Sequence, residues 1–213
     1  TENIPKPMLK VGNKPILQTT VEGLVDKGFN NIIMCLGYKS DTIKNYFGVG
    51  SQFGAIIKYI NEEKRMGTAG SLSLIDSKMK HPFFVMNGDL LTNLDYEKML
   101  NFHNQNNAKA TMCVREYEVN VPFGVVKTDN EKILSIEEKP DQSFYVNAGI
   151  YILEPECISL IPKDKFYDMP SLFNKVIERG ENAISFPSHE YWIDIGRISE
   201  YERANNEFEN IFL

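Results

Sequence analysis

Two aspartates far apart in the chain occupy positions where carboxylates could hold a metal ion. Asp89 follows an apolar run ending at Met86, and Gly88 beside it lets the backbone approach a ligand closely. Asp194 lies among apolar neighbours in Tyr191–Ile195, where a charge is costly unless it is paired or bound to a metal. Convergence of both carboxylates on one Mg²⁺ would explain both positions. The alternatives are that Asp89 caps a turn and that Asp194 is a hydrogen-bonded core residue.

Two lysines stand beside prolines, where their cations could meet phosphate. Pro5-Lys6-Pro7 stiffens the backbone around one lysine, and Glu138-Lys139-Pro140 ends a strand, because proline stops the ladder. Both segments could equally be surface turns. Glu62 precedes Gly67-Thr68-Ala69-Gly70, a helix start whose backbone amides could meet a base or a phosphate. A plain cap by Thr68 would give the same pattern.

Length and charge narrow the class of protein. A chain of 213 residues is long enough for one full core, and its formal net charge of −6 gives no basic surface for nucleic acid or an anionic membrane. The substrate is therefore expected to be a small molecule. Cys35, Cys113 and Cys157 lie in apolar surroundings, as buried free thiols do, which fits a reducing cytoplasm. The histidines show no zinc-binding spacing, and the apolar runs have strand length.

Hydrophobic periodicity predicts alternating helices and strands in the first part of the chain. The expected elements are a helix between Pro15 and Gly28, a strand at Asn31–Leu36, a short helix at Asp41–Phe47, a strand at Ala55–Ile60, a helix at Thr68–Ile75 and a strand at Phe83–Met86. Uninterrupted apolar strands between helices favour a parallel sheet covered on both faces. A ligand site then lies at the carboxyl ends of the strands, where Asn87-Gly88-Asp89 is found.

The second part of the chain is richer in strands with hairpin-like loops. The expected elements are strands at Ala110–Glu116, Gly124–Thr128, Ile133–Glu138 and Phe144–Ile152, a helix at Pro170–Arg179, strands at Ala183–Phe186 and Tyr191–Ile195, and a polar terminal helix from about Ser199. We interpret the four hairpin-forming strands as a mixed region that faces a sugar. Apolar residues near the C-terminus predict that the terminal helix docks on a further surface, as in a homo-oligomer; they are Phe208, Ile211, Phe212 and Leu213.

The order of these short motifs, from one end of the chain to the other, resembles the sugar-1-phosphate nucleotidyltransferase family. The motifs are Pro5-Lys6-Pro7-Met8-Leu9, Lys14-Pro15-Ile16-Leu17, Gly67-Thr68-Ala69-Gly70, Asn87-Gly88-Asp89, Pro122-Phe123-Gly124-Val125-Val126, Glu138-Lys139-Pro140, Asn147-Ala148-Gly149-Ile150-Tyr151 and Trp192-Ile193-Asp194-Ile195-Gly196. The resemblance implies an α/β, Rossmann-like (GT-A-like) nucleotidyltransferase fold. Such a fold has a mostly parallel central sheet, helices on both faces and a smaller mixed β region that binds the sugar.

The resemblance also implies roles for individual residues. Lys6 would contact the triphosphate, and Asp89 and Asp194 would hold Mg²⁺. Lys139 would bind the sugar phosphate. The nucleotide site would also include Glu62, Gly67 and Thr68, and the sugar site would include Gly124, Glu138, Asn147 and Gly149.

The family position that reads the base corresponds to Glu62. A carboxylate accepts hydrogen bonds, and guanine offers adjacent N–H donors whereas uracil and thymine offer one, so we expect GTP. The segments Glu63–Gly70, Met112–Tyr117 and Asp194–Arg197 are most similar to glucosamine-1-phosphate guanylyltransferases of legionaminic acid biosynthesis. The sugar stays open, because mannose, glucosamine and heptose phosphates would use the same residues.

The sequence departs from the family at its start. The family's glycine-rich signature, GGxGTRLxPLT, should end at about Thr1, so the triphosphate-cradling loop and the first strand are missing from the single domain spanning 1–213. We expect the natural protein to contain them, and a pair of CBS regulatory domains upstream would fit the same relatives.

The resulting hypothesis is a cytoplasmic enzyme that joins GTP to a sugar-1-phosphate and releases pyrophosphate, with no covalent intermediate. A second hypothesis is a regulatory module that binds a nucleotide or nucleotide-sugar without turnover, which the missing loop permits. A third is a glycosyltransferase of similar architecture, although Asn87-Gly88-Asp89 carries one aspartate where such enzymes use Asp-x-Asp.

Overall fold

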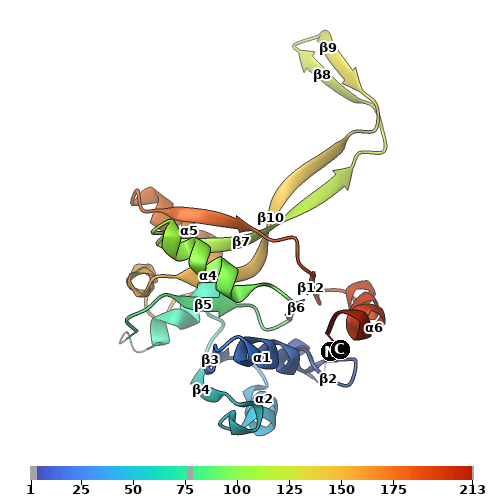
Figure 1. Cartoon of the computed structure of the whole chain (residues 1–213). Coiled ribbons are helices and arrows are strands. Elements are labelled where there is room, and N and C mark those ends of the chain that lie inside the picture. The colour runs from blue at the N-terminus through green and yellow to red at the C-terminus, as the bar shows by residue number, and fades with distance from the viewer. Residues whose placement is uncertain (1–3, 76–78, 213) are drawn as a thin grey trace.

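Helices and strands alternate along the chain in the computed structural model, which describes residues 4–75 and 79–212 (Figure 1). The α-helices are α1 (Ile16–Asp26), α2 (Ser40–Phe47), α3 (Gly67–Gly70), α4 (Tyr96–Gln105), α5 (Met169–Glu178) and α6 (Ile198–Phe212). The strands are β1 (Lys10–Val11), β2 (Lys14–Pro15), β3 (Asn31–Leu36), β4 (Ile56–Asn61), β5 (Phe83–Met86), β6 (Leu90–Thr92), β7 (Ala110–Asn120), β8 (Val125–Asp129), β9 (Lys132–Glu137), β10 (Asp141–Leu153), β11 (Ala183–Pro187) and β12 (Trp192–Asp194). Short 3₁₀-helices occur at Lys6–Met8, Ser51–Phe53, Ser71–Leu74 and Pro155–Leu160.

The main sheet of the described residues is mixed, where the sequence led us to expect a mostly parallel one. Its strand order is β11-β7-β10-β5, in which β10 is antiparallel to both neighbours and β11 is parallel to β7. The parallel pair β3–β4 forms a separate small sheet. The difference arises because β10, a strand of the second half, pairs with β5 along Phe83–Met86, where a parallel neighbour was expected.

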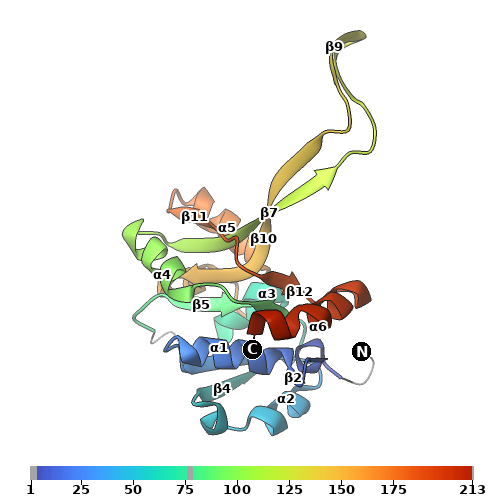
Figure 2. The same cartoon turned by 45° about the vertical axis from the view of Figure 1, so that its right-hand side comes forward.

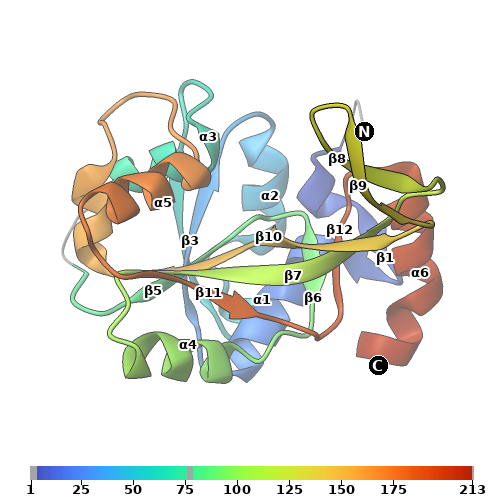
Figure 3. The same ribbon diagram turned by 90° about the horizontal axis from the view of Figure 1, so that it is seen from above.

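Helices cover both faces of this sheet, as predicted. Figure 3 shows α1 and α4 on one side and α3 and α5 on the other. Side chains of a strand alternate between faces, so on β10 Ile150 and Ile152 pack with Met99 of α4. Tyr151 and Leu153 point the other way and pack with Met169 and Leu172 of α5, in a second buried cluster. The body is therefore a three-layer α/β structure.

Helix α4 is an element that the sequence interpretation missed. The Asp95 carboxylate accepts a hydrogen bond of 2.9 Å from the Lys98 amide and so caps its first turn. Tyr96, Met99 and His103 form its buried stripe at helical spacing. The stripe is short and includes a histidine, which weakened the periodic signal.

The terminal helix α6 docks on the body of its own chain. Phe208 is 1% exposed and packs with Val11, Ile16 and Ile193. Phe212 makes an edge contact with Tyr191. These two apolar residues therefore need no second subunit, whereas Leu213 and Thr1, which also entered the sequence argument, lie outside the described residues. Among the described helices, none is long and apolar enough to cross a membrane.

A two-stranded ribbon projects far from the body (Figures 1 and 2). We define the arm as residues 116–145, which comprise the outer parts of β7 and β10 and the antiparallel hairpin β8–β9. Many large apolar side chains of the arm are exposed, namely Tyr117, Val119, Phe123, Val126, Ile133, Leu134, Ile136, Phe144 and Tyr145. The smaller β region predicted from the sequence thus exists, but it is antiparallel and stands apart from the body.

Candidate active site

Asp89 lies in the turn that links β5 to β6. The amide of Asn87 donates to the Gly149 carbonyl at 3.0 Å, and the Asp89 carbonyl accepts from the Ile195 amide at 3.1 Å. These bonds join the turn to β10 and to the end of β12. A Cβ atom on Gly88 would lie 3.3 Å from Cγ of Pro7, so the loop that carries Lys6 packs closely over this turn.

Asp194 reaches the same place from the other end of the sequence. It is the last residue of β12, where it pairs with Leu90 of β6. Burial raises the pKa of its half-buried carboxyl, the nearby Asp89 and Glu200 carboxylates raise it further, and Lys6 lowers it. The structure therefore brings Asp89, Asp194 and Lys6 together, as the sequence predicts.

The two structural alternatives for these aspartates find no support in the described part of the chain. No hydrogen bond there ends on the carboxylate of Asp89 as a turn cap, and none ends on that of Asp194 as a core interaction. The described residues contain no cluster of three or more acidic, histidine or cysteine side chains arranged to hold a metal ion alone. What they offer is a pair of carboxylates open to an external partner.

Glu200 is an acidic neighbour that sequence reasoning missed. Its carboxylate accepts hydrogen bonds from the amides of Gly196 (3.1 Å) and Arg197 (2.7 Å) and so caps the start of α6. The signal was present in the sequence, because Glu200 is the third residue after Arg197, the position of the acid in a capping box. It adds negative charge beside Asp194 and gives the site a stronger attraction for cations.

The predicted sugar residues Asn147 and Gly149 lie at the root of the arm, next to Asn87. Gly149 has φ of +72°, which strains any other residue, and a Cβ atom there would come within 2.7 Å of Nδ2 of Asn87, so a larger residue would displace the Asn87 side chain. The side chain of Asn147 accepts from the Gly149 amide at 2.8 Å and donates to the Tyr151 hydroxyl at 2.8 Å. These two residues therefore border the Asp89 turn.

Glu62 stands at the end of β4, away from Asp89, beside Gly37 and Met66. Its carboxylate is half-buried, accepts a weak hydrogen bond of 3.4 Å from the Met66 amide, and would lie 3.9 Å from a Cβ atom on Gly37. Absence of a side chain at Gly37 leaves one side of the carboxylate open. This arrangement is suited to accepting hydrogen bonds from a planar base.

In the segment after Glu62, two backbone amides are already occupied within the protein. The amides of Ala69 and Gly70, which were expected to meet a base or phosphate, both donate to the Tyr167 carbonyl. Thr68 caps α5 instead of its own helix, because its hydroxyl accepts from the Met169 amide at 2.8 Å. Gly67 has φ of +78° and no room for a Cβ beside the Tyr167 carbonyl, so its glycine serves local packing.

The family assignment follows from comparison with known proteins. A family profile described as nucleotidyl transferase matches residues 1–211. The chain belongs to the nucleotidyl transferase family. The resemblance drawn from the motifs is thus confirmed, and a third hypothesis based on glycosyltransferases is not needed.

Relatives within this family act on sugar-1-phosphates by name. The chain is 34% identical to a UTP–glucose-1-phosphate uridylyltransferase of Synechocystis sp., covering 96% of this chain and 58% of the relative. It is 32% identical to a mannose-1-phosphate guanyltransferase of Yarrowia lipolytica, covering 94% and 57%. The crystal structure of HddC from Yersinia pseudotuberculosis matches with a TM-score of 0.75 and 28% identity, over 97% of this chain and 91% of that one. The chain thus spans a little under three fifths of the length of the curated relatives.

The remaining predicted residues lie on the arm, whose hairpin β8–β9 stands far from strands β6 and β12 of the body in Figure 1. Figure 2 shows the same projection of β9 from another direction. Gly124 and Glu138 are neighbours there, since a Cβ atom on Gly124 would lie 2.9 Å from a carboxylate oxygen of Glu138. Lys139 follows β9 with φ of +46° and is exposed. The structure therefore divides the expected sugar-phosphate residues between the body and the arm.

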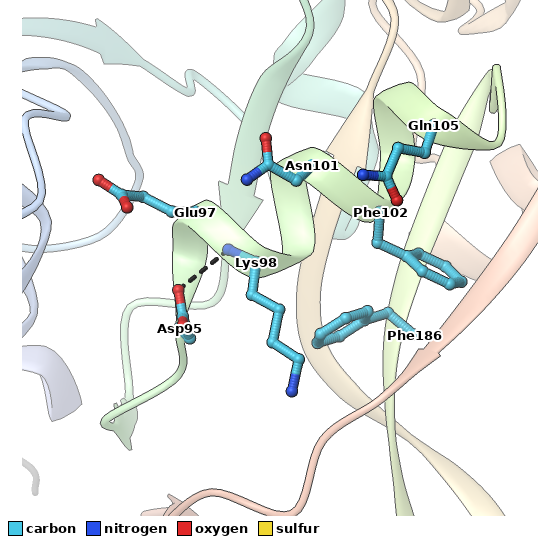
Figure 4. A pocket seen from close by; sticks show the side chains of 7 residues that line it. All are labelled: Asp95, Glu97, Lys98, Asn101, Phe102, Gln105 and Phe186. Carbon is cyan, nitrogen blue, oxygen red and sulfur yellow. Dashed lines mark hydrogen bonds between the residues drawn. The ribbon is translucent and has the colours of Figure 1, made fainter.

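A hollow on the outer side of α4 is separate from the site (Figure 4). Its walls include the rings of Phe102 and Phe186, whose centroids are 5.3 Å apart, and the side chain of Lys98. None of the predicted site residues lines it. The candidate active site is accordingly the surface around Asp89 and Asp194.

Proposed function

We propose that this protein transfers a nucleotidyl group from a nucleoside triphosphate to a sugar-1-phosphate and releases pyrophosphate. The observation that carries the proposal is the convergence of Asp89, Asp194 and the Lys6 loop at the ends of β5 and β12. Carboxylates beside one lysine suit a reaction in which phosphates must be bound and their charge neutralised. The uridylyl- and guanylyltransferase names of the relatives support the same reaction class.

The residues fit Mg²⁺ as the expected cofactor. Mg²⁺ is commonly held by one or two carboxylates together with substrate phosphates, and Asp89 and Asp194 are two such oxygen donors without a competing hydrogen bond among the described residues. When bound, Mg²⁺ neutralises charge on the phosphate oxygens. Burial and the repulsion from the neighbouring acids raise the pKa of Asp194, and a cation between the two aspartates would relieve that repulsion.

The protein's own residues would supply positioning. Lys6, held over the Asp89 turn through the packing of Pro7 on Gly88, would steady the leaving pyrophosphate. Attack would come from an oxygen of the sugar-1-phosphate on the α-phosphorus, in line with the leaving group, so no covalent enzyme intermediate is required. Lys139 would orient the attacking phosphate when the arm lies over the body.

GTP is the nucleotide that we propose, because Glu62 offers a hydrogen-bond acceptor for the adjacent N–H groups of guanine. A mannose-1-phosphate guanyltransferase among the relatives and the structure of HddC complexed with GMP-PN support this choice. The uridylyltransferase of Synechocystis points to UTP as the competing nucleotide. For the sugar we propose glucosamine-1-phosphate, in a pathway to legionaminic acid or a related cell-surface glycan. Mannose-1-phosphate and heptose-1-phosphate are the competing substrates.

One observation favours a second candidate function. Glu138 and Lys139 follow β9, and the hairpin β8–β9 stands far from β6 and β12 of the body in Figure 1, as would suit a module that binds a nucleotide or nucleotide-sugar without turnover. Pyrophosphate release separates the two. The natural full-length protein would be tested with Mg²⁺ and each nucleoside triphosphate against glucosamine-, mannose-, glucose- and heptose-1-phosphates.

Release with GTP and one sugar would support the enzyme and the role of Glu62 together. Release with UTP, CTP or dTTP alone would keep the reaction and reject guanine. If no pair releases pyrophosphate, the binding module becomes the better explanation.

The Asp89→Asn variant tests the proposed metal carboxylate. We expect it to lose at least about 100-fold in turnover, because it removes charge from the site while keeping shape. Its melting temperature should stay close to that of the wild type. Asp41→Asn, an exposed aspartate in the first turn of α2, is the matched control and should retain activity. Normal rates in Asp89→Asn would remove this carboxylate from the mechanism.

A further inference from the structure

A β-bulge separates the arm from the body. β10 pairs with β7 up to Asn147, opposite Val114, and resumes at Tyr151, opposite Met112. The three residues 148–150 of β10 therefore face a single residue of β7. Some of their backbone N–H and C=O groups cannot form hydrogen bonds with β7. Buried backbone groups need other partners, because an unpaired carbonyl or amide is costly.

Three hydrogen bonds from outside the ladder satisfy this bulge. The indole Nε1 of Trp192 donates to the Ala148 carbonyl at 2.8 Å, and the Asn87 amide donates to the Gly149 carbonyl at 3.0 Å. The Gly149 amide donates to Oδ1 of Asn147 at 2.8 Å. The turn that bears Asp89, the strand that bears Asp194 and the root of the arm thus meet at one bulge.

Trp192 is itself held by Arg115. The guanidinium carbon of Arg115 lies 5.8 Å from the centre of the indole ring, and its Nη1 donates to the Glu190 carbonyl at 2.5 Å. Arg115 pairs with Val146 at the base of the arm, so it joins the arm to the segment that leads into β12. Side chains two residues apart lie on the same face of a strand, which places Trp192 and Asp194 on one face of β12.

We infer that Trp192, held by Arg115, is a positioning residue that fixes the metal carboxylate of Asp194 relative to the sugar residues Asn147 and Gly149. This inference rests on the proposed function. Trp192 links the two subsites in two ways. Its indole N–H donates to a carbonyl of the bulge, and its own strand, β12, also carries Asp194. Loss of the N–H therefore loosens the sugar subsite relative to the metal subsite and leaves the nucleotide subsite at Glu62 unchanged.

The test uses Trp192→Phe, which keeps an aromatic ring and removes the N–H. We expect kcat/KM for the sugar-1-phosphate to fall by about tenfold, while KM for the nucleotide changes by less than about twofold. Tyr59→Phe is the matched control, because it removes a hydroxyl that donates to the Gly48 carbonyl at 2.7 Å, away from the bulge. A merely structural role would lower the melting temperature and change both KM values alike, and that result would overturn the inference.

Arg115→Met tests whether Arg115 acts through Trp192. Residues that act as a unit are non-additive, so the double variant should lose no more than about twofold beyond the worse single variant. Arg115→Lys keeps a cation over the ring and should recover part of the loss. If the fold loss in kcat/KM of the double variant equals the product of the two single losses, Arg115 and Trp192 act separately, and this part of the inference is overturned.

A readout without turnover distinguishes this inference from the proposed function. Trp192 is the single tryptophan of these 213 residues, so the tryptophan fluorescence of this chain reports on the bulge. Asn147→Ala removes the side chain that binds the Gly149 amide in the bulge, and the indole N–H binds the neighbouring Ala148 carbonyl. We therefore expect the acrylamide quenching constant of Trp192 to rise by about twofold. Tyr59→Phe should leave it unchanged. Absence of pyrophosphate release in the wild type would reject the proposed function. An unchanged quenching constant in Asn147→Ala would instead reject the structural link between Trp192 and the bulge.

Discussion

At the residue scale, the surroundings of Asp194 disfavour its ionised form. The same neighbouring carboxylates would favour a bound cation. Burial and the charges of Asp89 and Glu200 raise its pKa, so at neutral pH its ionised form disfavours the folded state. We therefore expect Asp194→Asn to abolish turnover and yet to raise the melting temperature by about 1 to 3 °C in metal-free buffer.

The gain should shrink as the pH falls through the raised pKa of Asp194, because the wild-type residue then becomes neutral as well. Differential scanning fluorimetry with EDTA at pH 7 and at pH 4.5 measures both effects, and Asp41→Asn serves as the control. A lower melting temperature for Asp194→Asn at pH 7 would show that this carboxylate stabilises the metal-free fold, contrary to the argument.

Gly149 can be compared with a second glycine of similar backbone conformation. Gly149 and Gly180 have φ of +72° and +69°, but a Cβ atom on Gly149 meets Asn87 at 2.7 Å whereas one on Gly180 meets nothing within 4 Å. Gly180→Ala should cost about 1 kcal/mol from the backbone alone. Gly149→Ala should cost about 2 kcal/mol or more and also lower activity, because Asn87 must move. Urea unfolding measures the two costs, and equal values would contradict the contact argument.

The site residues that could be predicted from the sequence are those that lie in short local motifs. The sequence placed Asp89 just after one apolar strand and Asp194 among the apolar residues of another, and the cost of a lone buried charge led us to expect that the two carboxylates share a metal ion. Glu200 was missed because its role depends on where α6 begins. The helix start Gly67–Gly70 was expected to offer backbone amides to a base or a phosphate. The binding of the Ala69 and Gly70 amides to the Tyr167 carbonyl could not be predicted, because Tyr167 lies far along the chain, where local sequence gives no indication of contact.

At the scale of elements, a buried histidine joins α4 to the sheet. His103 is 1% exposed, its Nδ1 lies 2.7 Å from the Thr111 hydroxyl, and its Nε2 lies 3.5 Å from a Glu154 carboxylate oxygen. Burial lowers the pKa of His103, and Glu154 opposes this only in part. The histidine is therefore neutral in the folded protein near pH 7.

Acidification should weaken this junction. Because the pKa of His103 is lower in the folded than in the unfolded state, the unfolded chain takes up the proton first, and stability is lost as the pH falls below about 6.5. In His103→Gln the free energy of unfolding should depend less on pH between 7.5 and 5.5. His189→Gln, at an exposed site, is the control, and equal slopes for wild type and His103→Gln in urea titrations would contradict the prediction.

Element identity was predicted more accurately than element pairing. β3 (Asn31–Leu36) and β5 (Phe83–Met86) occur over the residues expected, because each is a short apolar run that contains β-branched or aromatic side chains, which favour strands. The pairing of β5 with β10 could not be predicted in the same way. It depends on strands far apart in the chain, and an apolar run fits a parallel or an antiparallel neighbour equally well.

At the scale of the whole molecule, the arm is the feature that the sequence did not predict. Its strands were recognised, but the bulge at residues 148–150, where the arm leaves the body, and the hydrogen bond from Trp192 to Ala148 depend on contacts far apart in the chain and not on local propensity. A two-stranded ribbon with Phe123 73% exposed is only marginally stable alone in water. Coverage by the body or by substrate would remove this apolar surface from water.

Because the predicted site residues are divided between the body and the arm, the role of Lys139 on the arm can be tested directly. If the arm lies over the body during the reaction, its cation meets the sugar phosphate and Lys139→Met should raise KM for the sugar-1-phosphate by about tenfold or more, with a smaller change for the nucleotide. Lys132→Met is a close control, since Lys132 is an exposed lysine at the start of β9 on the same arm and carries the same charge.

A selective loss in Lys139→Met would mean that one defined cation of the arm enters the site. Equal losses in both variants would mean that the arm contributes only its general charge, and no loss in either would mean that turnover does not use the arm. Salt separates the first two outcomes further, because screening weakens a general attraction between exposed charges more than a direct contact with bound phosphate. The comparison thus measures whether the projecting arm and the carboxylates of the body form a single site.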